Sequence, residues 1–387
     1  MGILSGLKVV DATYGMAGPL LTQLLADMEP RMVRVDAPNG GVRKQQGYQV
    51  RLRGRRSIVV DRSRAQSHAV LERLARSADV LISEPALDGL NPLPWSWPEL
   101  EAMNARLVYC RITGYGDEGP ETEGWAHDHL VAAKYGVYDQ PGWRDGPTYL
   151  AAPIPSLGAA LLSLQAIGSA LYVREKTGRG QEVTTSLLAG SLAYHPGFVR
   201  ATIERPLPDP GLMGRSPLGA APFYSIYECG DGNWLHFGCL TQQFQQRAMR
   251  AIGLADELTA LGFGQGRQAP PETREQVIGL ITARMKERSF AEWAATFEEK
   301  DIPHAPSQWT EDLLDDPQVR HEGLVVTVDD PVDGMMEQMG TAIVFDDAPA
   351  PPPGPAPLPG QDTDEICREL GFDEAGIRAL RTSGAIA

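Results

Sequence analysis

An arginine-rich window is the strongest electrostatic feature of this sequence. The segment "RKQQGYQVRLRGRRSIVVDRSR" carries one acid, Asp61, among the basic residues Arg43, Lys44, Arg51, Arg53, Arg55, Arg56, Arg62 and Arg64. Guanidinium groups suit phosphates because they form paired, charge-assisted hydrogen bonds with them. The window therefore predicts a phosphate-bearing anionic ligand. The alternative is a solvated arginine face that balances acids elsewhere on the surface.

A second segment that could do chemistry is "GYGDEGPETEGWAHDHLVAAKYG", residues 114–136. Its Gly-rich loop follows a strand-like run, and His127, Asp128 and His129 then open a helical pattern. An acid with neighbouring histidines can transfer protons, and loop amides can stabilise charge on a carbonyl oxygen. The alternative is that Asp128 is a helix cap or first-turn acid and that the histidines are merely exposed.

In the first 115 residues, short apolar runs rich in Val, Ile and Leu alternate with helical patterns. The runs cover residues 7–13, 31–38, 57–61, 79–83 and 107–112. Such alternation predicts an α/β fold with a doubly wound parallel sheet. Ligands bind such sheets at the carboxyl ends of the strands, which is where the loop of residues 114–136 would lie. The turn after the first run has Gly15 and Gly18 in a GxxG spacing, so the dinucleotide fingerprint GxGxxG is absent.

Composition narrows the class of protein. With 387 residues, 42% of them hydrophobic, the chain can bury a large core in two or three domains. A net charge of -15 argues against nonspecific nucleic-acid binding as the main function. The N-terminus lacks the layout of a signal peptide, so we expect a cytoplasmic protein. The four cysteines are scattered, which indicates reduced thiols and no metal site.

The stretch "YLAAPIPSLGAALLSLQAIGSALYVREKTGRGQ" predicts a long helix of small and apolar residues. No Asp or Glu occurs between Asp145 and Glu175. The segment still contains prolines, serines and a glutamine, so we expect a helix buried in the protein and no membrane contact.

Several motifs, in order along nearly the whole chain, resemble the class III CoA-transferase family. This family includes formyl-CoA and carnitine CoA-transferases and the related 2-methylacyl-CoA racemases. The resemblance rests on "GLKVVDATYGMAGPLLTQLLADM", "RGRRSIVVD", "ADVLIS", "RITGYGDEGP", "REKTGRGQEV" and "PLPGQDTDEICRELGFDEAGIRAL".

The resemblance implies a large Rossmann-like α/β domain made from both chain ends, a smaller inserted α+β domain and two interlocked protomers. We therefore expect a large domain over residues 1–200, a linker at 201–220 and a small domain at 221–325. Residues 326–387 would return to the large domain through a proline-rich connector at 346–360.

The family moves coenzyme A, a co-substrate, between an acyl-CoA thioester and a free carboxylic acid. By position, Met16 and Ala17 would lie in the turn that meets CoA, with Arg43, Arg53 and Arg55 in its basic strip. The implied assembly is a homodimer, or a heterodimer with a homologous chain. Tyr14 stands where the family often has Arg or His, and "SEPAL" replaces the usual loop against the adenine.

The main departure concerns the nucleophile. The family's catalytic Asp lies about eighteen residues before the "REKTG" turn, and counting back from Arg174 reaches Ser156. A carboxylate attacking a thioester gives a mixed anhydride that a second carboxylate can exchange with, whereas a serine would give an ordinary ester. Ser156 is a candidate nucleophile, and the alternative is a helix N-cap just after Pro155.

Four hypotheses follow. The chain is a CoA-transferase that uses another acid, with Asp128 the best candidate, or it is a structural subunit of a heteromeric transferase without its own nucleophile. It is alternatively a 2-methylacyl-CoA racemase with His127 as one base, or a protein that only binds CoA esters.

Overall fold

The computed structural model describes residues 2–38, 47–84, 93–122, 124–138, 149–193, 219–264, 271–345, 348–349 and 354–387. Arg43, most of the expected linker and part of the expected proline-rich connector lie outside these residues. The chain divides into two compact units. Unit 1 contains Met1–Val137, Leu150–Phe198 and Asp316–Ala387, and unit 2 contains Tyr138–Tyr149 and Val199–Asp315.

Six parallel strands form the sheet of unit 1, in the order β3-β2-β1-β4-β5-β6. They are β1 Lys8–Ala12, β2 Arg31–Asp36, β3 Arg56–Val59, β4 Val80–Ser83, β5 Val108–Thr113 and β6 Gln181–Ser186. Most of their side chains are buried, as expected of a parallel sheet with both faces covered. The predicted parallel α/β sheet is therefore confirmed. The strand order reverses between β1 and β4, and such a switch point opens a crevice at the carboxyl ends of the strands.

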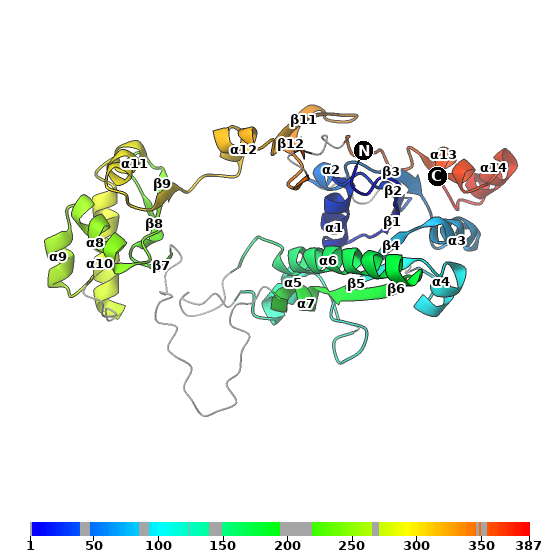
Figure 1. Ribbon diagram of the computed structural model, residues 1–387, viewed down its shortest axis with the longest axis horizontal. Helices are drawn as coiled ribbons and strands as arrows, with labels where there is room; N and C mark the ends of the chain where they lie inside the picture. The colour runs from blue at the N-terminus through cyan, green and yellow to red at the C-terminus, as the bar shows by residue number, and fades with distance from the viewer. Residues whose placement is uncertain are drawn as a thin grey trace. The chain divides into compact units, whose positions relative to one another are not determined.

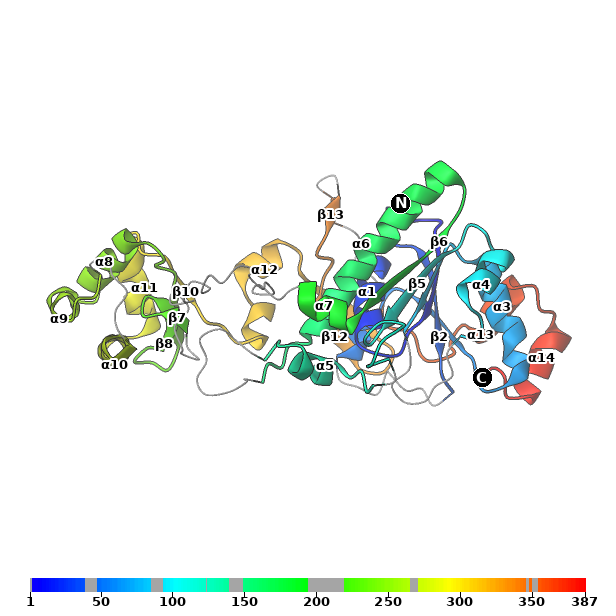
Figure 2. The same ribbon diagram turned by 90° about the horizontal axis from the view of Figure 1, so that it is seen from below.

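Helices cover both faces of this sheet (Figures 1 and 2). One face carries α1 Ala17–Ala26, α5 Asp128–Lys134, α6 Ile154–Thr177 and α7 Leu187–Ala193. The other carries α3 His68–Ser77, α4 Trp97–Met103, α13 Thr363–Glu369 and α14 Glu374–Thr382. Because strand side chains alternate, Val9 belongs to the core with α1 and α6, whereas Val10 belongs to the core with α3 and α14.

The long acid-free helix of the sequence is α6. It is long and apolar enough to cross a membrane, and it is the one such helix among the described residues. It packs against α1, α7, β5 and β6, but it also carries exposed side chains such as Leu161 and Tyr172. The buried helix that the sequence predicts is therefore confirmed only in part. Gly178 ends it with a φ of 73°, a left-handed conformation that glycine adopts without strain.

The N-terminal half of α6 meets α7 backbone to backbone. A Cβ added at Gly158 would overlap the main chain of Gly190, and a Cβ added at Gly190 would overlap the carbonyl oxygen of Pro155. The two glycines therefore allow the first turns of α6 to lie closer to α7 than any other residue type would permit.

Unit 2 has an antiparallel sheet in the order β10-β9-β8-β7. Its elements are β7 Gly219–Ala221, β8 Tyr224–Glu228, β9 Trp234–Phe237, β10 His304–Pro306, α8 Gln242–Ala251, α9 Ala255–Ala260, α10 Pro271–Met285 and α11 Phe290–Glu299. An aromatic core that includes Phe237, Trp293 and Phe297 joins helices to sheet. The Trp293 indole donates a hydrogen bond to the Met285 carbonyl at 2.9 Å, which satisfies its one buried polar atom.

The remaining elements of unit 1 are short. They are α2 Tyr48–Arg51, α12 Pro317–His321, β11 Val325–Asp330, β12 Gly334–Met339, β13 Val344–Phe345 and β14 Ala348–Pro349. β11 and β12 form an antiparallel hairpin.

A fully buried ion network lies beneath the β1–α1 turn. Asp11 on β1 pairs with Arg34 on β2 at 3.0 Å and with Arg55 at 2.7 Å, and no part of these side chains reaches solvent. Burial alone would raise the pKa of Asp11, but the two guanidinium groups outweigh it and hold the pKa below its ordinary value. Arg55 also donates to Thr22 on α1 at 2.8 Å, so the network joins strands β1 and β2 to α1.

We expect Asp11→Asn to lower the free energy of unfolding by about 3 to 5 kcal/mol, because it leaves two buried guanidinium groups without their shared anion. Chemical denaturation followed by circular dichroism measures this change. Asp364→Asn is the matched control, since Asp364 pairs with Arg381 at 2.8 Å on the surface and should contribute below about 1 kcal/mol. Equal losses in the two variants would contradict a structural role for the network.

Candidate active site

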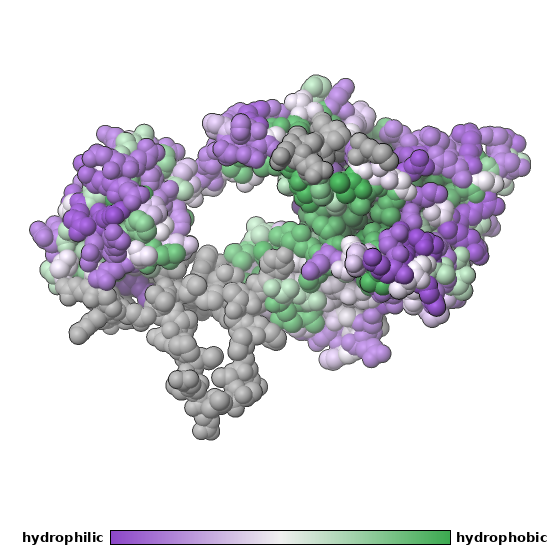
Figure 3. Space-filling model, viewed as in Figure 1, coloured by the Kyte–Doolittle hydropathy of each residue, from purple (hydrophilic) through white to green (hydrophobic). Residues whose placement is uncertain are grey.

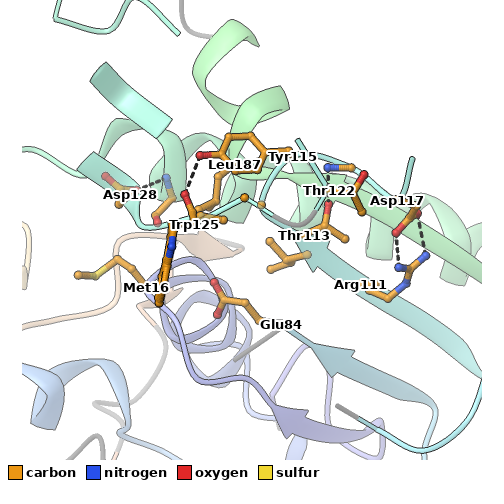
Figure 4. Close-up of a pocket in the computed structure, with 16 residues that line it drawn as sticks. Met16, Glu84, Arg111, Thr113, Tyr115, Asp117, Thr122, Trp125, Asp128 and Leu187 are labelled. Carbon is orange, nitrogen blue, oxygen red and sulfur yellow. Dashed lines mark hydrogen bonds and ion pairs between the residues drawn. The ribbon is translucent and has the colours of Figure 1, made fainter. Parts of the chain in front are cut away.

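A cavity of about 440 Å³ lies at the carboxyl edge of the unit 1 sheet (Figure 4). Its wall is formed by segments that follow β1, β4, β5 and β6 and by the first turns of α5 and α6, and it includes Met16, Glu84, Arg111, Thr113, Tyr115, Asp117, Trp125, Asp128, Ser156 and Leu187. This edge of a parallel sheet is where α/β proteins bind ligands, so the cavity is the candidate active site.

Glu84 directly follows β4 and points toward the N-terminus of α1. Its Oε2 accepts hydrogen bonds from the amides of Gly15 at 2.9 Å and Gly18 at 3.1 Å. A Cβ added at Gly15 would overlap the Glu84 carboxyl group, and one added at Gly18 would overlap the side chain of Thr13. Gly15 is therefore needed because the turn lies against this carboxyl group, and Gly18 is needed because the turn lies against Thr13.

Burial raises the pKa of Glu84 to about 7, although the amides of Gly18, Gly15 and Ala17 oppose the shift. Nearby Asp11 adds to the increase. Both the protonated and the ionised form of Glu84 are therefore present near neutral pH. This residue was missed by the sequence interpretation. The available signal was an acid placed immediately after a buried strand, at the edge where sheets of this type bind ligands.

Met16 and Ala17, which the resemblance places beside CoA, have different environments. Met16 lines the cavity. Ala17 is fully buried, and its amide is directed to Glu84. Three amides at the N-terminus of α1 are therefore already hydrogen-bonded to the Glu84 carboxyl group. Binding of CoA by this turn stays a prediction, and in this structure it would rest on the Met16 side chain.

Asp128 and Ser156 meet across the cavity wall. Asp128 Oδ1 accepts a hydrogen bond from the Ser156 amide at 2.7 Å (Figure 4). The N-cap of α6 is Pro153, so the interpretation of Ser156 as the N-cap is wrong, and Asp128 supplies the acceptor for this helix end. Both Asp128 Oδ2 and Ser156 Oγ are buried, and neither has a hydrogen-bond partner among the described residues. Buried polar atoms are nearly always hydrogen-bonded, so these two mark a place prepared for a ligand.

Asp128 is also the first residue of α5, and the sequence allowed it to be a first-turn acid there. Its neighbour His127 is the N-cap residue of α5 and is exposed. The His127 ring stacks on Trp125, with ring centroids 6.0 Å apart. His127 is not among the described residues that line the cavity, so the structure brings Asp128 and Ser156 together and leaves His127 outside.

The arginine window is largely paired within the protein. Arg53 is buried and contacts Asp27 at 2.8 Å and the Gly340 carbonyl at 3.1 Å. Arg55 is held by Asp11, and burial lowers its pKa to about 10. Both guanidinium groups stabilise the fold through these contacts. Neither guanidinium group is exposed to a ligand, so their predicted role in phosphate binding stays a prediction.

We expect the stability of the wild type, relative to Glu84→Gln, to fall as pH rises from 5 to 8. The folded protein holds a proton on Glu84 up to about pH 7, whereas the unfolded chain releases it near its ordinary pKa of 4.5. Stability is therefore full below pH 4.5 and lost as pH rises through 7, by roughly 3 kcal/mol in total.

Thermal unfolding of both proteins across this pH range measures the difference. The control is Glu101→Gln, which removes an acid paired with Arg179 on the surface. If the wild type instead gained stability over the Gln variant with rising pH, the raised pKa of Glu84 would be contradicted.

Comparison with known proteins identifies the family. Residues 4–363 match the model of CoA-transferase family III. The chain is 26% identical to succinyl-CoA:glutarate CoA-transferase of Mus musculus over 99% of this chain and 90% of that protein. It is 30% identical to alpha-methylacyl-CoA racemase of Homo sapiens over 99% and 97% of the two chains. The crystal structure of a CAIB/BAIF family protein from Brucella suis superposes with a TM-score of 0.78 and 25% identity, covering 95% of this chain and 99% of that one. The chain therefore belongs to CoA-transferase family III.

Proposed function

We propose that this protein is a CoA-transferase that moves CoA between an acyl-CoA thioester and a free carboxylic acid, with Asp128 as its nucleophile. The observation that supports this proposal is the buried Oδ2 of Asp128, which has no hydrogen-bond partner among the residues that the structure describes. Its other oxygen is hydrogen-bonded to the amide of residue 156, the position where the sequence resemblance places the nucleophilic Asp. A carboxylate from another helix thus lies next to the place of the missing acid.

The chemistry needs only this carboxylate and the two substrates. Asp128 attacks the thioester carbonyl carbon, the C–S bond breaks, and the electron pair leaves on sulfur, giving a mixed anhydride and CoA. The thiolate then attacks the Asp128 carbonyl and releases the first acid, which leaves CoA bound to Asp128 as a thioester. The second acid attacks that thioester in the same way, and a final attack by CoA releases the new acyl-CoA and restores the carboxylate.

Ser156 serves as a hydrogen-bond donor in this proposal. Ser156 is 1% exposed. Among the described residues its Oγ has no hydrogen-bond partner, and no histidine lines the cavity to take its proton. A hydroxyl in this position can donate to the oxygen of the substrate carbonyl as negative charge develops there.

Racemase activity is the second candidate, because the human racemase is a relative at 30% identity. Racemisation requires a base on each side of the substrate α-carbon. His127, the expected base, is exposed and lies outside the described cavity wall, which weighs against this candidate. Exchange of the substrate α-proton with deuterated water would favour racemisation over transfer.

We expect Asp128→Asn to lose transferase activity roughly 1000-fold or more, because the amide can still accept from the Ser156 amide but cannot attack a thioester. The assay incubates the purified protein with acetyl-, butyryl- or succinyl-CoA and a ¹³C-labelled acid, and follows the label into acyl-CoA. Intact-protein mass spectrometry with peptide mapping should place an acyl or CoA adduct on Asp128.

Ser156→Ala is the matched control in the same cavity and should keep the adduct at Asp128. An adduct that maps to residue 156 would contradict the assignment of the nucleophile. A wild type with neither adduct nor turnover, and which co-purifies with a homologous chain, would instead support the interpretation as a subunit of a heteromeric enzyme.

The protein is also proposed to work as a dimer of two copies in the cytoplasm. Hydrophobic side chains remain exposed along one face of α6, including Leu157, Leu161 and Tyr172, and hydrophobic surface gathers over α1 and beside α6 (Figure 3). Exposed apolar surface of this kind is typical of a protein interface.

We expect Leu161→Arg to shift the protein toward monomer, because it places a charge within this face. Size-exclusion chromatography with light scattering measures the mass. Ala69→Arg, on the exposed surface of α3, is the control and should leave the mass unchanged. A wild type that is monomeric at every concentration would overturn the proposed dimer.

A further inference from the structure

We propose that Glu84 is a second catalytic carboxyl group of this cavity, which gives a proton to the sulfur of CoA when the thioester breaks and takes it back when the next thioester forms. The proposal rests on the proposed transferase function and adds a residue to it.

The first support is position. Glu84 and Asp128 come from different elements, the end of β4 and the start of α5, and both line the same cavity (Figure 4). Glu84 is 9% exposed and is one of the residues that line the cavity. A group bound at Asp128 would therefore lie in the same cavity as the Glu84 carboxyl group.

The second support is that Glu84 has no cation beside it in the part of the chain that the structure describes. Among the described residues no Lys, Arg or His forms a salt bridge with it, and the charge that acts on it is that of Asp11. Asp117, another acid of the cavity wall, differs in this respect because it is bound by Arg111, with 2.8 Å between Oδ2 and Nη2. A carboxyl group held by amides and without a cation can exchange a proton without breaking an ion pair.

The third support is that the structure holds Glu84 in place whichever form it takes. Oε2 accepts hydrogen bonds from the amides of Gly15 and Gly18. Gly15 also leaves space for the carboxyl group, and a side chain at position 15 would occupy that space. A carboxyl oxygen accepts such bonds both when ionised and when protonated. The raised pKa of Glu84 then keeps a proton available at neutral pH.

The C–S bond breaks and its electron pair moves to sulfur, the Glu84 O–H bond breaks, and an S–H bond forms, which leaves a Glu84 carboxylate and neutral CoA thiol. Before the next attack the carboxylate removes the same proton and regenerates the thiolate. A thiol has a pKa near 8.5, so an acid with a pKa near 7 can protonate it and the reverse transfer remains accessible. No thiolate then has to be held in the cavity between the two attacks, which avoids the free-energy cost of burying an unpaired charge.

The alternative is that Glu84 only anchors the β1–α1 turn. Glu84→Gln separates the two roles, because the amide oxygen can still accept from Gly15 and Gly18 but the side chain has no acidic proton. A purely structural role would change KM or stability and leave the shape of the pH profile intact.

The experiment measures kcat and kcat/KM from pH 5.5 to 9, using the best substrate pair of the acyl-CoA panel. In the wild type we expect kcat to fall about tenfold per pH unit above pH 7, where Glu84 loses its proton. Glu84→Gln should lower kcat roughly 100-fold at pH 6.5 and remove this limb. Glu84→Asp, which restores an acid, should recover part of the rate and a sloping limb, and Glu101→Gln should match the wild type.

The outcomes separate the two proposals. An active wild type whose pH profile is unchanged in Glu84→Gln overturns the role of Glu84 and leaves the transferase function standing. A Glu84→Asp variant no better than Glu84→Gln also counts against proton transfer. A wild type that neither turns over the panel nor forms an adduct overturns the transferase function, and the catalytic role of Glu84 with it.

Discussion

Asp11 is the buried anion on which the geometry of the site depends. Through Arg34 and Arg55 it joins β1, β2 and α1, and its Oδ1 accepts a hydrogen bond from the Thr13 hydroxyl at 2.6 Å. Thr13 in turn lies against Gly18, whose amide binds Glu84. A charge beneath the sheet edge thus fixes the turn, and the turn fixes the carboxyl group that faces the cavity. Burying an ion pair costs desolvation free energy, and here the hydrogen bonds that the members of this network make offset that cost.

The cavity concentrates acids where the family resemblance would place one. Asp128 reaches the first turn of α6 from α5, and Glu84 reaches the cavity from β4. Their environments differ, because one carboxylate supports a helix end and the other is enclosed by a turn of small residues. Two carboxyl groups with different surroundings can divide the work of nucleophile and proton carrier between them. Ser156 adds an uncharged hydroxyl group beside Asp128.

Much of the large unit could be predicted from the sequence. Runs of Val, Ile and Leu indicated strands, and their alternation with helical patterns correctly predicted a parallel sheet. The arginine window was harder, because the acids that pair with Arg53 and Arg55 are Asp27 and Asp11, which lie outside it in sequence. Pairing over such distances depends on strand order, and local composition cannot reveal it. His127 and Asp128 show the same limit at short range, because adjacent residues at a helix start face different surroundings.

The close contact between α6 and α7 has a consequence for how this site can change over time. Gly158 and Gly190 let the main chains of α6 and α7 touch beside position 156. A substitution at position 156 that keeps these two glycines would therefore change the group offered to the cavity while the contact between the two helices stays in place.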